Sequence, residues 1–253
     1  MNTIILCEGK TDAVLLGYYI DKICRFTHTN EKINKEITID KKRSNEFFEW
    51  HTRNKNCLAI WGVGGKDCFK LAIEEFYNVL KKSSDTLTYR QFIIVCDRDI
   101  EKDNEIILSK YSKYFTQSSI ILANNQLHKG EFLNSFGQSR SINTFALVIP
   151  QDKLGALENA LLDSIKEDKY DRNIVENGEK FVKETRLVAR KYISSDRLEL
   201  KAKLSSVFAI MSPEKVFNFI DDMLKTTVKW EEKKYLNDLF EDLVKVLDNG
   251  ELI

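Results

Sequence analysis

Short apolar runs alternate with segments of helical spacing along the first 150 residues of the chain. The apolar runs are rich in β-branched and aromatic residues and are bounded by polar or glycine-rich segments, as buried strands are. The predicted strands are 3–7, 57–61, 92–96, 118–122 and 144–150, and the predicted helices are 13–23, 68–82 and 105–115. This alternation predicts an α/β fold with a mostly parallel sheet and crossover helices.

Two regions depart from this alternation. Residues 26–56 are polar and rich in Lys and Asn, so we predict an insertion there, with one candidate strand at 36–40. After Pro150 the pattern becomes helical, and the predicted helices are 154–165, 174–190, 197–209, 214–226 and 232–248. The sequence therefore predicts two parts, an α/β domain over 1–150 and a helical C-terminal region over 151–253.

The charges of the chain balance, with 39 Lys and Arg against 39 Asp and Glu among 253 residues. This balance excludes a strongly basic nucleic-acid-binding protein, although it allows a local basic groove around 32–55. No apolar stretch approaches the roughly 20 residues that span a membrane, and the first residues lack the pattern of a signal peptide. The five cysteines are scattered, which argues against disulfides and zinc. We therefore expect a cytoplasmic protein without membrane contact.

Acidic residues directly follow two of the predicted strands. Glu8 follows 3–7, and Asp97 and Asp99 follow 92–96. If these strands are neighbours, the three acids meet at the carboxyl edge of the sheet, and Asp12 joins them from one helical turn beyond Glu8. In an extended strand end, Asp97 and Asp99 would also face the same side.

Carboxylates that converge stay ionised together only when a cation neutralises them. Ligand sets made only of oxygen suit Mg²⁺ or Mn²⁺ rather than zinc. The acidic pattern therefore predicts a divalent-metal site with phosphoryl chemistry. Acids at strand ends also cap helices and hold turns, and for Glu8 taken alone that structural role is the commoner one.

Several segments resemble the Toprim domain, which topoisomerases, primases and OLD-type (overcoming lysogenization defect) nucleases share. IILCEGKTDA and IIVCDRD are similar to its two acidic motifs, and GVGGKD resembles the glycine segment of the OLD-type branch. TFALVIP with GALENALLDSI, and LKAKLSSVFAIMSPEKVFNFI, resemble a Toprim-like family of unknown function. The resemblance covers most of 3–226 and implies a Toprim-like, mostly parallel sheet flanked by helices.

The resemblance implies roles for the acids that match the motifs. Glu8 would be a general acid/base or a metal ligand, and Asp97 and Asp99 would be the metal-binding pair. Asp12 matches an additional acid that serves the metal in OLD-type nucleases. Glu158, in GALEN, would belong to a second metal site, although a solvated helix acid explains it equally well.

Glycines and lysines complete the candidate site. Gly9, Gly64 and Gly65 would let the backbone turn tightly and approach a phosphate. Lys66 would contact a phosphate, although GVGGKD lacks the full pattern of a nucleotide-binding P-loop. Lys203, with Lys201 nearby, would stabilise developing negative charge as a lysine does in OLD-type nucleases, and a solvated helix face is the alternative for both.

The expected function is a Mg²⁺- or Mn²⁺-dependent nuclease that acts on DNA or RNA, in nucleic-acid processing or in defence against phage. OLD nucleases carry a Walker ATPase domain that is missing here, so any ATPase would be a partner chain. Two alternatives stay open: a non-catalytic regulatory module that binds metal and phosphate, and a phosphohydrolase of small nucleotides. The apolar positions of the helical region fit either packing within one chain or a homodimer surface.

Overall fold

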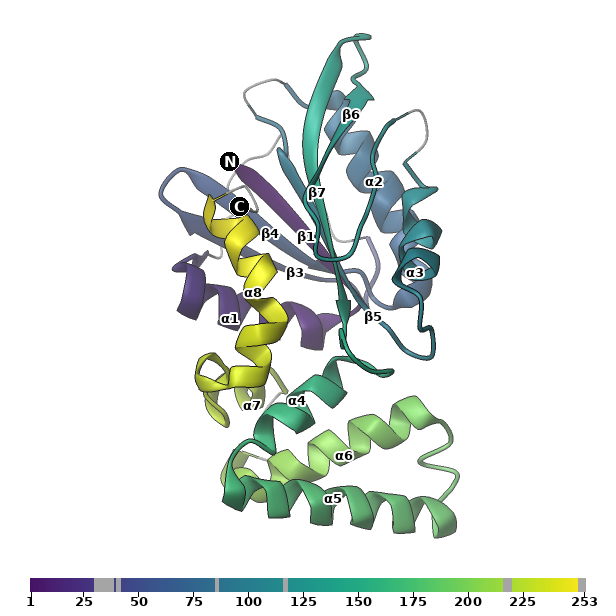
Figure 1. Ribbon diagram of the computed structural model, residues 1–253, viewed down its shortest axis with the longest axis vertical. Coiled ribbons are helices and arrows are strands. Elements are labelled where there is room, and N and C mark those ends of the chain that lie inside the picture. The colour runs from purple at the N-terminus through teal and green to yellow at the C-terminus, as the bar shows by residue number, and fades with distance from the viewer. Residues whose placement is uncertain (30–38, 40–41, 85–86, 116–117, 216–219, 250–253) are drawn as a thin grey trace. The chain divides into compact units, whose positions relative to one another are not determined.

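The computed structural model describes residues 1–29, 39, 42–84, 87–115, 118–215 and 220–249 (Figure 1). The chain divides into two compact units, and each is described by itself. The first unit combines Met1–Leu154 with Glu241–Ile253, and the second is Gly155–Phe240. The fold is α/β, as the alternation of strands and helices predicted.

The first unit contains a seven-stranded sheet in the order β2-β3-β4-β1-β5-β7-β6. Its centre is parallel and consists of β4 (Asn56–Gly62), β1 (Asn2–Cys7), β5 (Gln91–Asp97) and β7 (Ser139–Ile149). The chain reaches β1 first, then crosses to β4 on one side, and later to β5 and β7 on the other. The direction of winding thus reverses between β1 and β5, which makes that gap the topological switch point of the sheet.

Helices cover both faces of the parallel centre. The two helices α2 (Phe69–Lys82) and α3 (Asn104–Ser112) pack with the even-numbered side chains of β1 in one apolar core. The first helix, α1 (Lys10–Cys24), contacts β3 and β4 on the other face (Figure 1). Every residue of β5 is buried, because a central parallel strand is covered on both sides.

The predicted insertion over 26–56 contributes two strands to the sheet. Within it, β2 (Thr27–Thr29) pairs antiparallel with β3 (Phe47–Arg53), and β3 pairs antiparallel with β4. The candidate strand at 36–40 lies outside the described residues except for Ile39. Two of its polar residues, Glu49 and His51 of β3, are buried and in contact with each other, so polar residues here do not mark surface.

The predicted strand at 118–122 is wrong. This segment is a loop with one isolated bridge, from Ser118 to Phe132, and its Ile120 packs against the backbone of Gly130. The edge strand is instead β6 (His128–Leu133), which pairs antiparallel with β7. An edge strand alternates buried and exposed residues, so β6 lacks the continuous apolar run by which the central strands are recognised.

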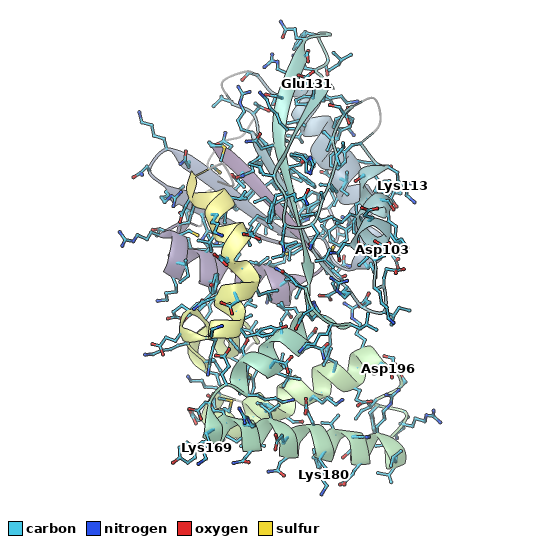
Figure 2. All side chains as sticks on the ribbon, viewed as in Figure 1. Asp103, Lys113, Glu131, Lys169, Lys180 and Asp196 are labelled. Atoms are coloured by element: carbon cyan, nitrogen blue, oxygen red, sulfur yellow. The ribbon has the colours of Figure 1, made fainter. Side chains whose placement is uncertain are left out.

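The second unit is helical, which confirms the pattern after Pro150. Its elements are α4 (Leu157–Ile165), α5 (Lys169–Val188), α6 (Asp196–Met211), the 3₁₀ turns η2 (Pro213–Lys215) and η3 (Trp230–Glu232), α7 (Ile220–Thr226) and the start of α8 (Lys234–Asn249). Val207 of α6 lies against Gly178 of α5, and both are buried, while Lys169 and Lys180 point outward from α5 (Figure 2). No helix in the described ranges is long and apolar enough to cross a membrane.

The carboxyl-terminal part of α8 is counted with the first unit, and two side chains of the sheet hold it there. The buried Gln91 amide donates to the carbonyl of Val246 at 3.3 Å. The Arg53 guanidinium donates to the carbonyl of Leu247 at 2.9 Å and pairs with Asp248. A boundary drawn at residue 150 therefore leaves out a segment that belongs to the sheet unit.

Candidate functional site

Two buried carboxylates stand at the switch point of the sheet. Glu8 directly follows β1, and Asp97 is the last residue of β5, the strand paired in parallel with β1. Glu8 is 3% exposed and Asp97 is 8% exposed. Both charges act on the Cys96 thiol. Its pKa is raised mainly by burial and further by the negative charges of Glu8 and Asp97. The order of the acids along the sequence therefore places both at the carboxyl ends of two neighbouring parallel strands.

Asp99 reaches the same edge by a different route from the one predicted. The strand ends at Asp97, and Asp99 adopts a left-handed conformation with φ 53°, so the argument from an extended strand end fails. Its carboxylate forms an ion pair with the ammonium of Lys66, and the two side chains are 42% and 41% exposed. The charge of Asp99 still acts on the Cys96 thiol.

Lys66 is the cation that faces this group of acids. Burial alone would lower the pKa of Lys66, but the hydrogen bond to Asp99 and the charges of Asp99 and Glu8 outweigh burial and raise it. Lys66 therefore stays protonated at neutral pH. An ammonium held beside Glu8 and Asp99 is in a position to contact an anionic ligand at this edge.

Asp12 supports the turn that carries Glu8. It lies in the first turn of α1, where its carboxylate accepts a hydrogen bond from the backbone N–H of Gly9 at 3.0 Å. Carboxylates near a helix N-terminus satisfy free N–H groups and interact favourably with the helix dipole. The structure thus gives Asp12 the role of a helix cap beside the site.

The glycines hold two turns against each other. The N–H groups of Gly64 and Gly65 donate to the carbonyl of Glu8 at 3.0 and 2.7 Å. A Cβ atom at Gly62 would lie 2.6 Å from the carbonyl oxygen of Gly9. These amides donate within the protein, as does that of Gly9, so the glycine pattern here reflects close backbone packing rather than an open phosphate cradle.

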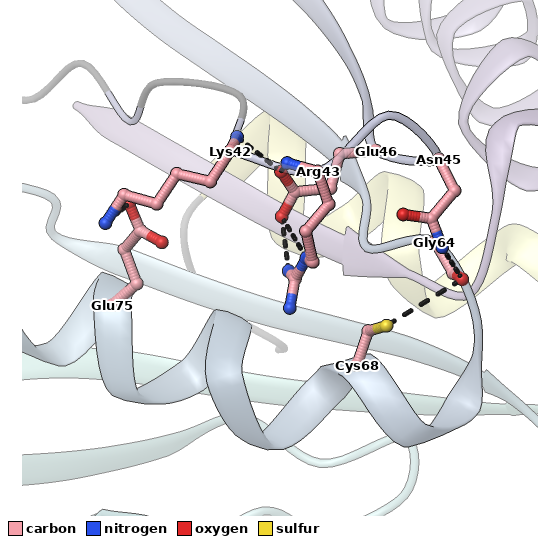
Figure 3. Close-up of polar contacts among 7 residues, drawn as sticks. All are labelled: Lys42, Arg43, Asn45, Glu46, Gly64, Cys68 and Glu75. Carbon is pink, nitrogen blue, oxygen red and sulfur yellow. Dashed lines mark hydrogen bonds and ion pairs between the residues drawn. The ribbon is translucent and has the colours of Figure 1, made fainter.

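The glycine turn is braced by a segment that the sequence offered only as insertion. The Asn45 amide donates to the carbonyl of Gly64 at 2.6 Å, and Glu46 accepts from the N–H groups of Lys42 and Arg43 at 2.7 and 2.8 Å (Figure 3). Burial alone would raise the pKa of Glu46, but these backbone hydrogen bonds and the Arg43 guanidinium lower it. Sequence reasoning missed this brace, because single polar residues in a polar stretch carry no pattern.

Arg98 is a second residue that the motif analysis passed over. Its backbone N–H donates to the carbonyl of Ile149 at 2.6 Å, and its guanidinium donates to the carbonyls of Pro150, Lys102 and Gln151 at 2.8, 2.9 and 3.0 Å. Arg98 therefore fastens the loop after β5 to the end of β7. The signal in the sequence was a basic residue between two acids, directly after a buried strand.

Two predicted site residues belong to the second unit. Glu158 lies in the first turn of α4. Lys203 lies on α6, where it forms an ion pair with Glu199 at 2.6 Å, and the nearby Lys201 is exposed. Their parts in the site remain predictions, because the two units are described separately.

The carboxylates at this edge of the sheet are the candidate ligands of a divalent ion. Across the described ranges, no group of three or more His, Cys, Asp or Glu side chains is arranged to hold a metal ion. Mg²⁺, however, is commonly held by only one or two protein carboxylates, with waters and substrate phosphates completing the shell. Glu8 and Asp97 are donors of the kind that such a site uses.

No family model and no curated protein matches this sequence. Among solved structures, the chain is similar to a hypothetical protein from Pyrococcus horikoshii OT3. The similarity has a TM-score of 0.48 and 15% sequence identity, and it covers 97% of this chain and 98% of that one.

Proposed function

We propose that the protein is a Mg²⁺- or Mn²⁺-dependent phosphodiester hydrolase of the Toprim type that cuts DNA or RNA. The observation that carries the proposal is the pair of buried carboxylates, Glu8 and Asp97, at the switch point between β1 and β5. Open α/β sheets bind their ligands at this point. Two buried acids that repel each other favour a cation between them, and a cation between acids attracts phosphate.

Each residue of the edge has a role in this proposal. Glu8 and Asp97 would hold the ion, and Glu8 could also accept a proton from water. Lys66, protonated and held by Asp99, contacts the phosphate. Asp12 keeps the Gly9 turn, and with it Glu8, in position. When bound, the ion would supply Lewis-acid stabilisation of the phosphate and a lowered pKa of water.

The experiment uses the full chain with Mg²⁺ or Mn²⁺ and a panel of plasmid, single-stranded DNA, transfer RNA and mononucleotides. The variants are Glu8→Gln and Asp97→Asn, which remove charge while preserving shape. Glu105→Gln, at an exposed position on α3, is the matched control. We expect metal-dependent cleavage of a polynucleotide that falls by about 10²-fold or more in both site variants and persists in the control.

Three other outcomes would each overturn part of the proposal. Cleavage that survives both substitutions would place the activity elsewhere. Hydrolysis confined to mononucleotides would favour the small-nucleotide phosphohydrolase. Mn²⁺ binding that is lost in Asp97→Asn, without cleavage of any substrate even when an ATPase partner is supplied, would favour the non-catalytic regulatory module.

A further inference from the structure

A cavity of about 330 Å³ opens beside the loop that follows Asp97. It lies within the first unit and is built from the segments that leave the carboxyl ends of β5 and β7. Its lining residues are Arg98, Lys102, Gln151, Asp152, Lys153 and Leu154. Three of these side chains are cationic and one is anionic, so the lining has a positive balance in a chain whose total charge is zero.

One of the lining cations is a buried guanidinium. Arg98 is 5% exposed, and a guanidinium has five N–H donors. Three of these donate to backbone carbonyls, namely those of Pro150, Lys102 and Gln151. Two donors therefore remain for a ligand.

The partners of Arg98 are neutral. Within the part of the chain that the structure describes, its polar side-chain contacts are those three carbonyls, and none is a carboxylate. Buried charges in proteins are normally paired, because removing an ion from water is costly. A buried cation that lacks an acidic partner and lines a cavity is suited to an anionic ligand. Arg is also the side chain whose fork of donors matches phosphate oxygens.

The position of the cavity relates this anion to the proposed reaction. Arg98 lies between Asp97 and Asp99 in the chain, and its N–H fixes this loop to the end of β7. A polynucleotide bound at the carboxylate edge carries further phosphates on either side of the one that is cut. The nearest of these is the anion that a cationic cavity along the same edge would meet.

We propose that this cavity is a phosphate subsite, which binds a phosphate of the nucleic-acid strand next to the scissile one. In this proposal the buried Arg98 contacts the phosphate, and the exposed Lys102 and Lys153 supply further positive charge. Asp152 opposes the anion and is outnumbered by these three cations. The inference rests on the proposed function, because it makes the substrate a strand with at least two phosphates rather than a mononucleotide.

Binding of a fluorescein-labelled single-stranded oligonucleotide tests the subsite without any cleavage. Fluorescence anisotropy is measured in EDTA over a range of salt concentrations, for the full chain and for Lys102→Glu and Lys153→Glu. Lys110→Glu, exposed on α3, is the matched control. We expect Kd to rise about fivefold or more in each subsite variant. The slope of the logarithm of the association constant against the logarithm of the salt concentration should become less steep by about one, as for loss of one phosphate contact.

Arg98→Gln is a third variant, and urea unfolding reports whether it stays folded, because Arg98 also ties two loops together. The two lysine variants lie at exposed positions and keep the test valid if Arg98→Gln unfolds. Competition with inorganic pyrophosphate and with AMP distinguishes a strand from a free phosphate compound. AMP that competes as well as an unlabelled oligonucleotide would overturn the strand assignment.

Unchanged Kd and salt slope in both lysine variants would overturn the subsite. Its failure and that of the proposed function remain distinguishable. Glu8→Gln should lose cleavage while it binds the strand normally, so weakened binding in the lysine variants without any nuclease activity would reject only the hydrolase. Cleavage that depends on Glu8, with normal binding in the lysine variants, would reject only the subsite.

Discussion

Adding one methyl group at Gly62 would force apart the two turns that form the carboxylate edge. The new Cβ atom would lie 2.6 Å from the carbonyl oxygen of Gly9, and ordinary contact begins near 3.4 Å. The backbone must therefore open by about 0.8 Å at a place where neither side is a flexible side chain. Overpacking of this kind costs about 1–3 kcal/mol.

The displacement acts on the site as well as on stability. The turn that would retreat carries Glu8, whose carbonyl is already tied to Gly64 and Gly65. A shift of this size in a catalytic group commonly costs about 10²-fold in rate. For Gly62→Ala we expect the free energy of unfolding to fall by about 1–3 kcal/mol. Any phosphodiesterase activity should fall by about 10²-fold.

Urea unfolding followed by circular dichroism measures the stability term, with Gly178→Ala as the control. At Gly178 the added Cβ meets a methyl group of Val207 at 3.2 Å and the backbone nitrogen of Val207 at 3.9 Å, and Ala is favoured over Gly within a helix by about 1 kcal/mol. The control should therefore change the free energy of unfolding by less than Gly62→Ala does. A Gly62→Ala protein as stable as the wild type would refute the close packing of the two turns.

Three further predictions concern single contacts. At Asp99, with φ 53°, a Gly variant should be about 1 kcal/mol more stable to urea than an Ala variant, because both lose the ion pair and only Ala keeps the left-handed strain. The pKa of Glu46 is lower in the folded protein than in the unfolded chain, where it is about 4.3. Ionised Glu46 therefore stabilises the fold at pH values above about 4.3, and this contribution is lost as the pH falls through the folded-state pKa. Wild-type stability should therefore decline more steeply than that of Glu46→Gln in urea titrations between about pH 5 and 3. Gln91→Leu leaves the Thr3 hydroxyl without its acceptor and should cost about 1–3 kcal/mol, part of which Thr3→Val restores in a double-mutant cycle.

The central strands could be predicted from sequence because burial on both faces leaves a continuous apolar run. β1, β4 and β5 are of this kind, and Glu8 directly follows β1 while Asp97 is the last residue of β5. The antiparallel strands outside this centre give no such signal. In β3, Glu49 and His51 face α1 at Gly17, where the absence of a side chain leaves room for them. From the sequence alone, polar residues such as these are predicted to be exposed.

The candidate site shows the same limit at the level of side chains. The spacing of Glu8 and Asp97 after their apolar runs was enough to place both at the ends of neighbouring parallel strands. The partnership of Lys66 with Asp99 was not predictable, because it depends on a left-handed residue that reverses the chain just after β5. The environment of Arg98 depends on three carbonyls from two separate loops, and no local pattern encodes those.

The division of the first unit into two segments of chain has a consequence for synthesis on the ribosome. The 86 residues from Gly155 to Phe240 are translated between the sheet and the part of α8 that docks on Gln91 and Arg53. At a translation rate of roughly 5–20 residues per second, about 4–17 s pass between synthesis of the sheet segment and synthesis of this part of α8. The helical unit is continuous in sequence and can fold before this part of α8 reaches the sheet. During that interval the Gln91 amide lacks its carbonyl partner, and the sheet face that α8 will cover is open to chaperones.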